Sequence, residues 1–133
     1  MHGLMPAALA ECGLYAAAEE LADRMPIPTA VECDLGGVPL PGVVESTGYL
    51  VISEALANAV KHSRARSLLV RLRHHDESLR VEVSDDGVGG AHLNGGAGMR
   101  GMADRIDALR GVLMIDSPPG GGTRVVAKVP CAS

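Results

Sequence analysis

Hydrophobic and polar residues recur with two different periods along the chain, and the change of period divides it into helical and extended segments. Leucines and alanines with helical spacing predict a helix over residues 7–25, with Gly13 as a break and Pro26 as its end. Residues 29–35 are expected to form a strand. Residues 36–41 are rich in glycine and proline, and they predict a turn.

Residues 43–62 carry the strongest helical pattern of the chain. At about 100° per residue, this helix gathers one set of side chains on a side expected to face the core: Tyr49, Ile52, Leu56, Ala59 and Val60. The opposite side gathers a polar set: Thr47, Glu54, Asn58, Lys61 and His62. This helix is therefore expected to join a core face to a face available for chemistry.

Two alternating segments follow the helix. Residues 68–73 and 79–84 alternate between apolar and polar side chains, which predicts an antiparallel hairpin with its turn at residues 74–78. The second strand runs into Asp85, where a glycine-rich loop begins.

The last part of the chain predicts a helix and a second hairpin. Met99 to Leu109 have helical spacing, and Gly111 is expected to be the glycine at the helix C-terminus. Residues 112–116 and 123–129 are expected to form strands around a turn. The element order predicts an α/β fold, a two-layer α/β sandwich with helices on one face of a mixed, mostly antiparallel sheet, in one domain over residues 1–133.

Composition narrows the classes of partner. A length of 133 residues with 47% hydrophobic residues allows one buried core. The net charge of -4 gives no attraction to phosphate backbones, so no direct contact with nucleic acid is expected, and the apolar stretches are too short for a membrane span. Three widely spaced cysteines, Cys12, Cys33 and Cys131, fit neither a disulfide framework nor a zinc site. A cytoplasmic location is expected, although the parent protein could be a membrane-bound sensor.

Glu54 and Asn58 are the first candidates for chemistry. Four residues apart on a helix, their side chains point the same way. A carboxylate and an amide oxygen suit a hard cation that is otherwise bound by water and phosphate oxygens, which describes magnesium on a nucleotide. A solvated helix face is the alternative, and for this pair alone it is the better explanation.

Asp85 stands at a strand end, directly before Gly87 and Gly89. An aspartate there can accept a hydrogen bond from the exocyclic amine of a base, and the glycines allow a planar ring to approach the backbone. An ordinary turn is the alternative.

Glycines also precede the helix that begins near Met99. Of 17 glycines, seven lie between Gly87 and Gly101, and those from Gly95 onward lead into the helix N-terminus. Free N–H groups and the helix dipole favour phosphate at such a position. A flexible surface loop is the alternative.

In this order, the residues resemble the GHKL ATPases and, among them, the catalytic ATP-binding domain of sensor histidine kinases. Four stretches carry the resemblance: Glu54-Ala-Leu-Ala-Asn58-Ala-Val-Lys61-His62, Asp85-Asp-Gly87-Val-Gly89, Gly96-Ala-Gly98-Met99-Arg-Gly101-Met and Gly120-Gly121-Gly122-Thr123. Each stretch is weak alone, but four in order on the expected elements are specific. The sequence also resembles the subfamily that pairs with NarL/LuxR-type response regulators and lacks a phenylalanine box, and this chain contains no Phe.

The resemblance implies ATP and Mg²⁺ as cofactors. Asn58 would bind magnesium, and Glu54 would polarise or orient the attacking group. Asp85 would bind the adenine amine, while Gly87 and Gly89 would make room for the base.

The resemblance also implies a phosphate side to the site. Residues 91–97 would form a short lid over ATP, and Thr123 would support the base pocket through the last strands. The residues implied in nucleotide binding on this side are Lys61, His62, Gly96, Gly98, Met99 and Gly101; which of Lys61 and His62 touches phosphate is left open.

The implied activity is transfer of the γ-phosphoryl group of ATP to a histidine on a separate dimerisation domain, with a response regulator as an indirect partner. Residues 1–14 resemble the connector from that domain. Two alternatives stay open: an anti-sigma-factor serine kinase of the same superfamily, and a non-catalytic module that binds nucleotide and signals by docking.

Three other patterns lead elsewhere. Gly96 to Gly101 spell GxGxxG, and Asp116 follows at a distance suitable for a ribose-binding acid, but residues 91–95 do not form the strand that a dinucleotide fingerprint requires. A Walker A loop is excluded, because no glycine precedes Lys and then Ser or Thr. The pair His75-Asp76 mimics a phosphoacceptor site but falls in the expected hairpin turn, so the chain is not expected to phosphorylate itself efficiently.

Overall fold

A five-stranded sheet forms one layer of the molecule, in the order β1-β2-β3-β5-β4. The computed structural model describes residues 7–37, 39–88 and 97–131, and only the backbone at 7–12, 62–63 and 97–99. The strands are β1 (Thr29–Asp34), β2 (Leu68–His75), β3 (Ser78–Asp85), β4 (Val112–Asp116) and β5 (Thr123–Pro130). Strands β1 and β2 are parallel, and the other pairs are antiparallel. The mixed, mostly antiparallel sheet is as predicted.

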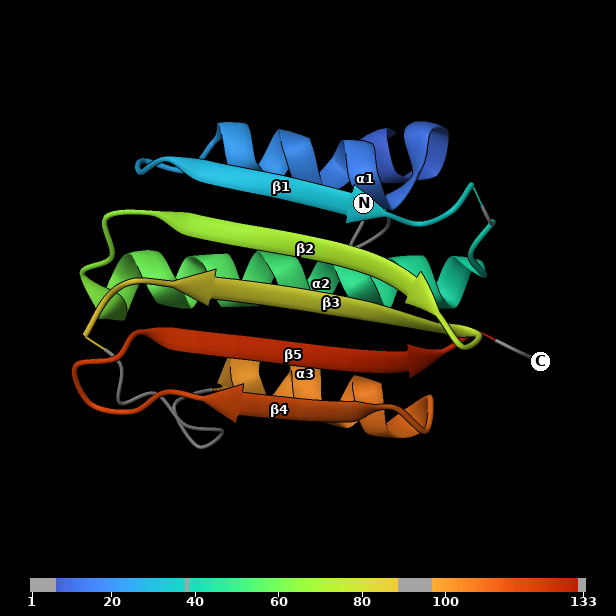
Figure 1. Cartoon of the computed structure of the whole chain (residues 1–133). Helices are drawn as coiled ribbons and strands as arrows, with labels where there is room; N and C mark the ends of the chain where they lie inside the picture. Colours follow the sequence, from blue (N-terminus) through green and yellow to red (C-terminus); the bar gives the residue numbers. More distant parts are fainter. Residues whose placement is uncertain (1–6, 38, 89–96, 132–133) are drawn as a thin grey trace.

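Helices form the second layer and cover one face of the sheet (Figure 1). They are α1 (Ala7–Asp23), α2 (Gly42–Asn58) and α3 (Ala97–Ala108), and a π-helix, η1 (Ala59–Ser63), continues α2. The predicted helix over 43–62 is therefore real, but its last turn is wider than an α-helix. The side chains of the strands and helices interlock in one core between the layers.

The predicted division of α2 into two faces was partly wrong. Ile52, Leu56 and Ala59 are buried as expected, whereas Val60 is exposed and Tyr49 is only half-buried. Thr47, expected on the polar face, is buried. The buried residues of α2 follow a spacing of three and four positions that starts at Val44 and includes Thr47. The buried face is therefore rotated about the helix axis relative to the face predicted from residue type.

The predicted break in α1 is real. Gly13 has φ 86° and ψ -178°, which is outside helical geometry and accessible to glycine. The chain bends there, and the freed N–H of Leu14 donates to a carboxylate oxygen of Glu45 at 3.2 Å. Glu45 lies in the first turn of α2, so one carboxylate joins the beginnings of two helical segments.

Two predicted turns needed correction. The β2–β3 hairpin turn contains only Asp76 and Glu77, because His75 pairs with Ser78. Both turn residues have positive φ, at 52° and 58°, as a tight two-residue hairpin requires. His75, expected in the loop, ends β2 as an exposed residue and pairs with Asp76 at 3.2 Å.

The end of α3 also differs from the prediction for Gly111. Arg110, with φ 61°, occupies the left-handed position at the helix end, while the N–H of Gly111 donates to the Ile106 carbonyl oxygen at 2.8 Å. A Cβ on Gly111 would lie 2.5 Å from the carbonyl oxygen of Lys128. Glycine stands there because β5 passes too closely for a side chain.

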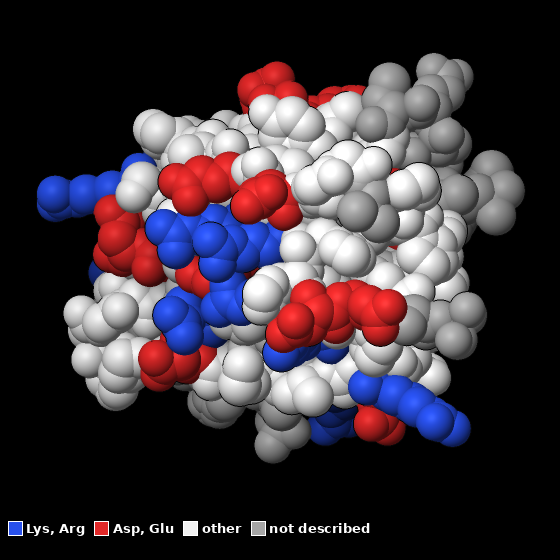
Figure 2. All heavy atoms as spheres, turned by 45° about the vertical axis from the view of Figure 1, so that its right-hand side comes forward, with Lys and Arg blue, Asp and Glu red and all other residues white. Residues whose placement is uncertain are grey.

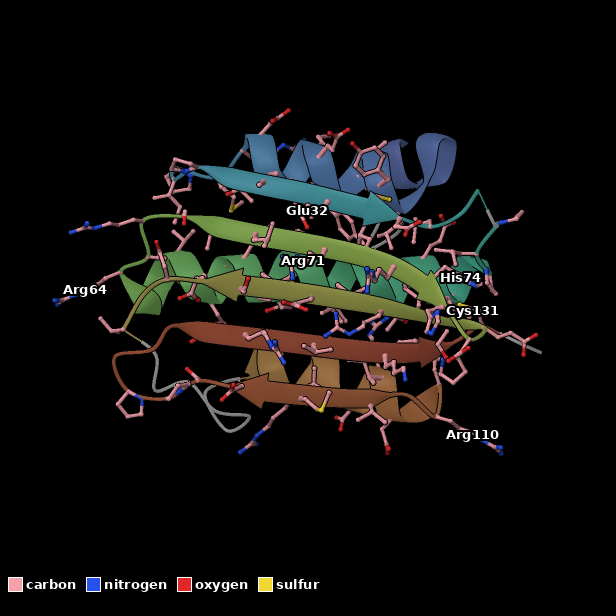
Figure 3. All side chains as sticks on the ribbon, viewed as in Figure 1. Glu32, Arg64, Arg71, His74, Arg110 and Cys131 are labelled. Carbon is pink, nitrogen blue, oxygen red and sulfur yellow. The ribbon has the colours of Figure 1, made fainter. Side chains whose placement is uncertain are left out.

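The sheet face opposite the helices carries ion pairs. Glu82 is buried on this face and receives a hydrogen bond from Arg80 at 2.8 Å, while Arg71 pairs with Glu32 at 3.0 Å. Figure 3 shows Glu32 and Arg71 on neighbouring strands. In the turned view of Figure 2, basic and acidic side chains lie interleaved rather than as one basic surface.

Among the described residues, no helix combines the length and apolar character that a membrane crossing requires.

Candidate functional site

The predicted base-binding residues lie at one end of the sheet. Asp85 is the last residue of β3, and its partner across the ladder is Thr123, the first residue of β5. Both side chains are half-buried and lie on the face covered by helices, because Val83 and Val125, two positions away, are in the core. Two residues that are 38 positions apart in sequence, 85 and 123, are thus direct neighbours.

Hydrogen bonds fix the side chains of this pair. A carboxylate oxygen of Asp85 accepts from the backbone N–H of Gly87 at 2.8 Å, which turns the chain sharply after the strand. The hydroxyl of Thr123 shares a 2.6 Å hydrogen bond with the hydroxyl of Ser117. Ser117 was not among the predicted site residues. The sequence feature that could have indicated it is a hydroxyl residue directly after β4 and before the Pro-Pro-Gly turn.

Gly122 allows the two strand ends to close against each other. A Cβ on Gly122 would lie 2.3 Å from the carbonyl oxygen of Asp85, and its φ is 77°. The N–H of Gly120 donates to the carbonyl oxygen of Val88 at 2.6 Å. The last glycine stretch therefore packs directly on the loop that follows Asp85.

The C-terminal end of α2 lies at the same end of the sandwich (Figure 1). Glu54 and Asn58 are half-buried there rather than fully solvated, whereas Lys61 is exposed on η1. The π-helix widens the chain directly after Asn58. Such wide turns are frequent at functional sites, because they redirect side chains that an α-helix would stack in line.

Asp86, the neighbour of Asp85, points to a different part of the protein. Its Oδ1 accepts hydrogen bonds from the backbone N–H groups of Arg66 at 2.7 Å and Ser67 at 3.0 Å. The Ser67 hydroxyl donates to its Oδ2 at 3.1 Å. These backbone donors, Ser67 first, hold the pKa of Asp86 below its ordinary value because they favour the ionised carboxylate.

The second predicted glycine stretch leads into α3. Gly98 and Gly101 lie in its first turns, and Figure 1 places the start of α3 at the site end. A Cβ on Gly101 would meet no atom of the described residues within 4 Å, so packing among those residues does not require glycine there. Gly89, Gly96 and lid residues 91–96 lie outside the described residues, as do the side chains of Met99 and His62, while Ala97 begins α3.

The donor set at this end fits magnesium held together with a phosphate ligand. Asn58 and Glu54 offer an amide oxygen and a carboxylate, which are hard donors. Within the described ranges, no group of three or more His, Cys, Asp or Glu residues could hold a metal ion by itself. Mg²⁺ on a nucleotide takes its other ligands from phosphate oxygens and water.

Comparison with known proteins identifies the family. Residues 44–133 match the family described as histidine kinase-, DNA gyrase B-, and HSP90-like ATPases. The chain belongs to this family. An uncharacterised sensor-like histidine kinase of Chloroflexus aurantiacus is 33% identical over 98% of this chain and 24% of its own length. Sensor histidine kinase NarS of Mycobacterium tuberculosis is 34% identical over 96% of this chain and 32% of its own length.

A solved structure agrees with these relatives. The histidine kinase domain of the Erythrobacter litoralis EL346 blue-light activated histidine kinase matches 90% of this chain and 63% of that chain, with a TM-score of 0.71 and 27% identity. The predicted resemblance to the ATP-binding domain of sensor histidine kinases is confirmed. The chain spans about a quarter to a third of the two relatives, so it corresponds to one part of their length.

Proposed function

We propose that this domain binds Mg-ATP and donates the γ-phosphoryl group to a histidine on a separate dimerisation domain of a two-component sensor kinase. The observation that carries the proposal is the meeting of three elements at one end of the sandwich (Figure 1): the end of α2 with Asn58, the end of β3 with Asp85, and the beginning of α3. Family membership and the sensor kinases among the relatives support the same reading.

In the proposed site, the half-buried carboxylate of Asp85 accepts a hydrogen bond from the adenine amine. Its Oδ1 accepts from Gly87, and its Oδ2 would accept from the base. Thr123, bonded to Ser117, supports the floor of the base pocket, and the backbone at Gly87 leaves room for a planar ring.

The phosphates would extend from the base toward α2 and α3. Asn58 would hold magnesium through its amide oxygen, and Glu54, one helical turn earlier, would orient the attacking group. Bound magnesium would neutralise charge on the phosphates. Lys61 and His62 would face the phosphate side with Gly96, Gly98, Met99 and Gly101, and the N-terminus of α3 would stabilise negative charge there.

Few side chains are needed for this chemistry, because phosphoryl transfer depends mainly on positioning and charge stabilisation. Lid residues 91–97 and Gly89 would complete the site and exclude water when closed. The acceptor histidine would lie on a domain that residues 1–14 connect to this one. The response regulator would receive the phosphoryl group from that domain, and the whole reaction would take place in the cytoplasm, where ATP is available.

Radiolabelled phosphoryl transfer tests this proposal. The chain is mixed with a separately purified dimerisation domain of a related sensor kinase and with ATP labelled at the γ position. Label is expected on the acceptor histidine only when both proteins and magnesium are present. ATP binding without transfer to any such domain would favour the docking module, and transfer to a serine of a small partner would favour the serine kinase.

Asn58→Ala sharpens the assignment of the metal. The side chain is half-buried at the end of α2, and alanine retains the helix, so the fold should persist. We expect the variant to lose the magnesium-dependent part of nucleotide affinity, measured by calorimetric titration with and without magnesium. Ser53→Ala, on the same helix, is the matched control. Unchanged magnesium dependence in Asn58→Ala would remove Asn58 from the metal site.

A further inference from the structure

The carboxylate of Asp86 connects two segments that are far apart in sequence. It accepts three hydrogen bonds from the loop before β2: two from the backbone N–H groups of Arg66 and Ser67, and one from the Ser67 hydroxyl. Hydrogen bonds to an ionised acceptor are stronger than neutral ones. Asp86 therefore holds this loop to the end of β3.

The loop that Asp86 holds is the exit from η1. It begins at Arg64, which has φ 54°, and it leads into Leu68. The N–H of Leu68 donates a 2.9 Å hydrogen bond to the carbonyl oxygen of Pro28. Figure 3 shows Arg64 at the end of the sandwich where α2 and η1 finish. Only residues 64–67 separate η1 from β2, so fixing Arg66 and Ser67 limits where η1 can lie.

Asp85 and Asp86 divide their contacts. Asp85 lies on the helix-covered side of β3 and bonds its own loop at Gly87. Asp86 is exposed, and its carboxylate is turned to Arg66 and Ser67 instead. One aspartate is thus available to a base, while the next is engaged by the chain that follows Asn58 and Lys61.

We propose that Asp86 is a positioning residue, which sets the separation between the adenine-binding end of β3 and the phosphate-side segment of α2 and η1. This role rests on the proposed function. It implies that Asp86 affects binding of the whole Mg-ATP molecule but has little effect on binding of the base alone. The lowered pKa of its carboxyl agrees, because the bonds favour the ionised form.

Two substitutions separate the hydrogen bonds from other effects. Asp86→Ala removes every acceptor, whereas Asp86→Asn retains an oxygen for the N–H groups of Arg66 and Ser67. Asp34→Ala is the matched control, because Asp34 is an exposed aspartate at the end of β1, far along the sheet from Asp85 by register. Affinity is measured for a non-hydrolysable ATP analogue with magnesium by calorimetry and for adenosine by NMR titration.

We expect Asp86→Ala to weaken Mg-ATP analogue binding about tenfold and adenosine binding less than about twofold. Asp86→Asn should restore most of the loss, and Asp34→Ala should resemble the wild type. Amide hydrogen exchange gives an independent readout: the N–H groups of Arg66 and Ser67 should be protected in the wild type and exposed in Asp86→Ala.

Equal losses for adenosine and the ATP analogue, without rescue by Asp86→Asn, would overturn the proposal and make Asp86 a direct ligand. Unchanged affinity for both would overturn it as well. Failure of the wild type to bind either ligand would instead overturn the proposed function, and it would be recognisable because exchange at Arg66 and Ser67 would still report the bonds to Asp86.

Discussion

The two ends of the sandwich are built in different ways. At the end away from the candidate site, strands β2 and β3 are joined by only Asp76 and Glu77, and the connection from α3 to β4 turns at Arg110. Backbone hydrogen bonds hold both, including the 2.7 Å bond from the N–H of Cys131 to the Glu77 carbonyl oxygen. These two connections are short, whereas residues 35–41, which join β1 to α2 at the same end (Figure 1), form a longer one.

At the site end, side chains and glycines hold longer connections. Asp85 and Asp86 each accept hydrogen bonds from backbone N–H groups, and Gly122 allows the end of β3 and the start of β5 to approach each other. The ends of the elements consequently remain separate, with loops between them that can meet a ligand. One end of the fold thus contains tight backbone turns, while the other carries the loops at which we propose that the nucleotide binds.

The largest expected effect comes from glycines that have no space for a Cβ. Gly122→Ala would place Cβ 2.3 Å from the Asp85 carbonyl oxygen, at a φ of 77°. We expect it to lower the free energy of unfolding by about 2–4 kcal/mol and to weaken nucleotide binding, because Asp85 must move. Gly111→Ala, at the other end, should lower stability by about 1–3 kcal/mol without affecting nucleotide affinity.

Gly120→Ala is the control for backbone strain alone. Gly120 has φ 78°, but within the part of the chain that the structure describes a Cβ there would meet nothing within 4 Å. Gly120→Ala should lower the free energy of unfolding, measured by chemical denaturation, by about 1 kcal/mol, which is well below the loss expected for Gly122→Ala. If the two variants lost the same stability, close packing at Gly122 would not explain its requirement for glycine.

A smaller effect is expected at the hairpin turn. Asp76 and Glu77 both have positive φ, which Asn and Gly adopt more readily. The double change Asp76→Asn and Glu77→Gly should stabilise the protein by about 0.5 kcal/mol, as measured by denaturation, and leave nucleotide affinity unchanged. A change in affinity would mean that the two ends are not independent.

The smallest effect is a local dependence on pH at the site end. The pKa of Asp86 is lowered from 3.8, so the hydrogen bonds stabilise the fold above that ordinary value and are lost as the pH falls through the lower folded pKa. NMR shifts of the Ser67 amide should therefore stay constant from neutral pH to about pH 4 and change only in stronger acid. A change centred above pH 4 would contradict the bonded, ionised state.

Much of the fold could be predicted from hydrophobic period, because alternation at 68–73 and 79–84 and helical spacing in α2 reflect which residues the core buries. The predictions were wrong where the polarity or type of a residue differs from what its place in the fold would usually favour. Thr47 is polar yet buried, since the stripe of α2 is set by the sheet it packs on. The left-handed conformation that was expected at Gly111 occurs at Arg110 instead. Glycine is needed at position 111 because β5 passes too closely for a side chain.

The stretches proposed for the site could be recognised in the sequence, but their arrangement in space could not. The pairing of Asp85 with Thr123 follows from a strand register that short-range pattern does not specify. Asp86 accepts hydrogen bonds from Arg66 and Ser67, which lie 20 and 19 positions earlier in the chain. The sequence alone therefore could not show that Asp85 and Asp86 have different partners. Ser117 was missed for the same reason, since only the folded β4–β5 turn brings it to Thr123.

The most direct test of the proposed adenine site is calorimetric titration of the chain and of Asp85→Asn with a non-hydrolysable ATP analogue, with and without magnesium, and with NAD as the competing ligand. We expect magnesium-dependent binding of the ATP analogue, its loss in Asp85→Asn, and no comparable binding of NAD. Preference for NAD, or undiminished ATP analogue binding in Asp85→Asn, would contradict the claim that the end of β3 is the adenine site.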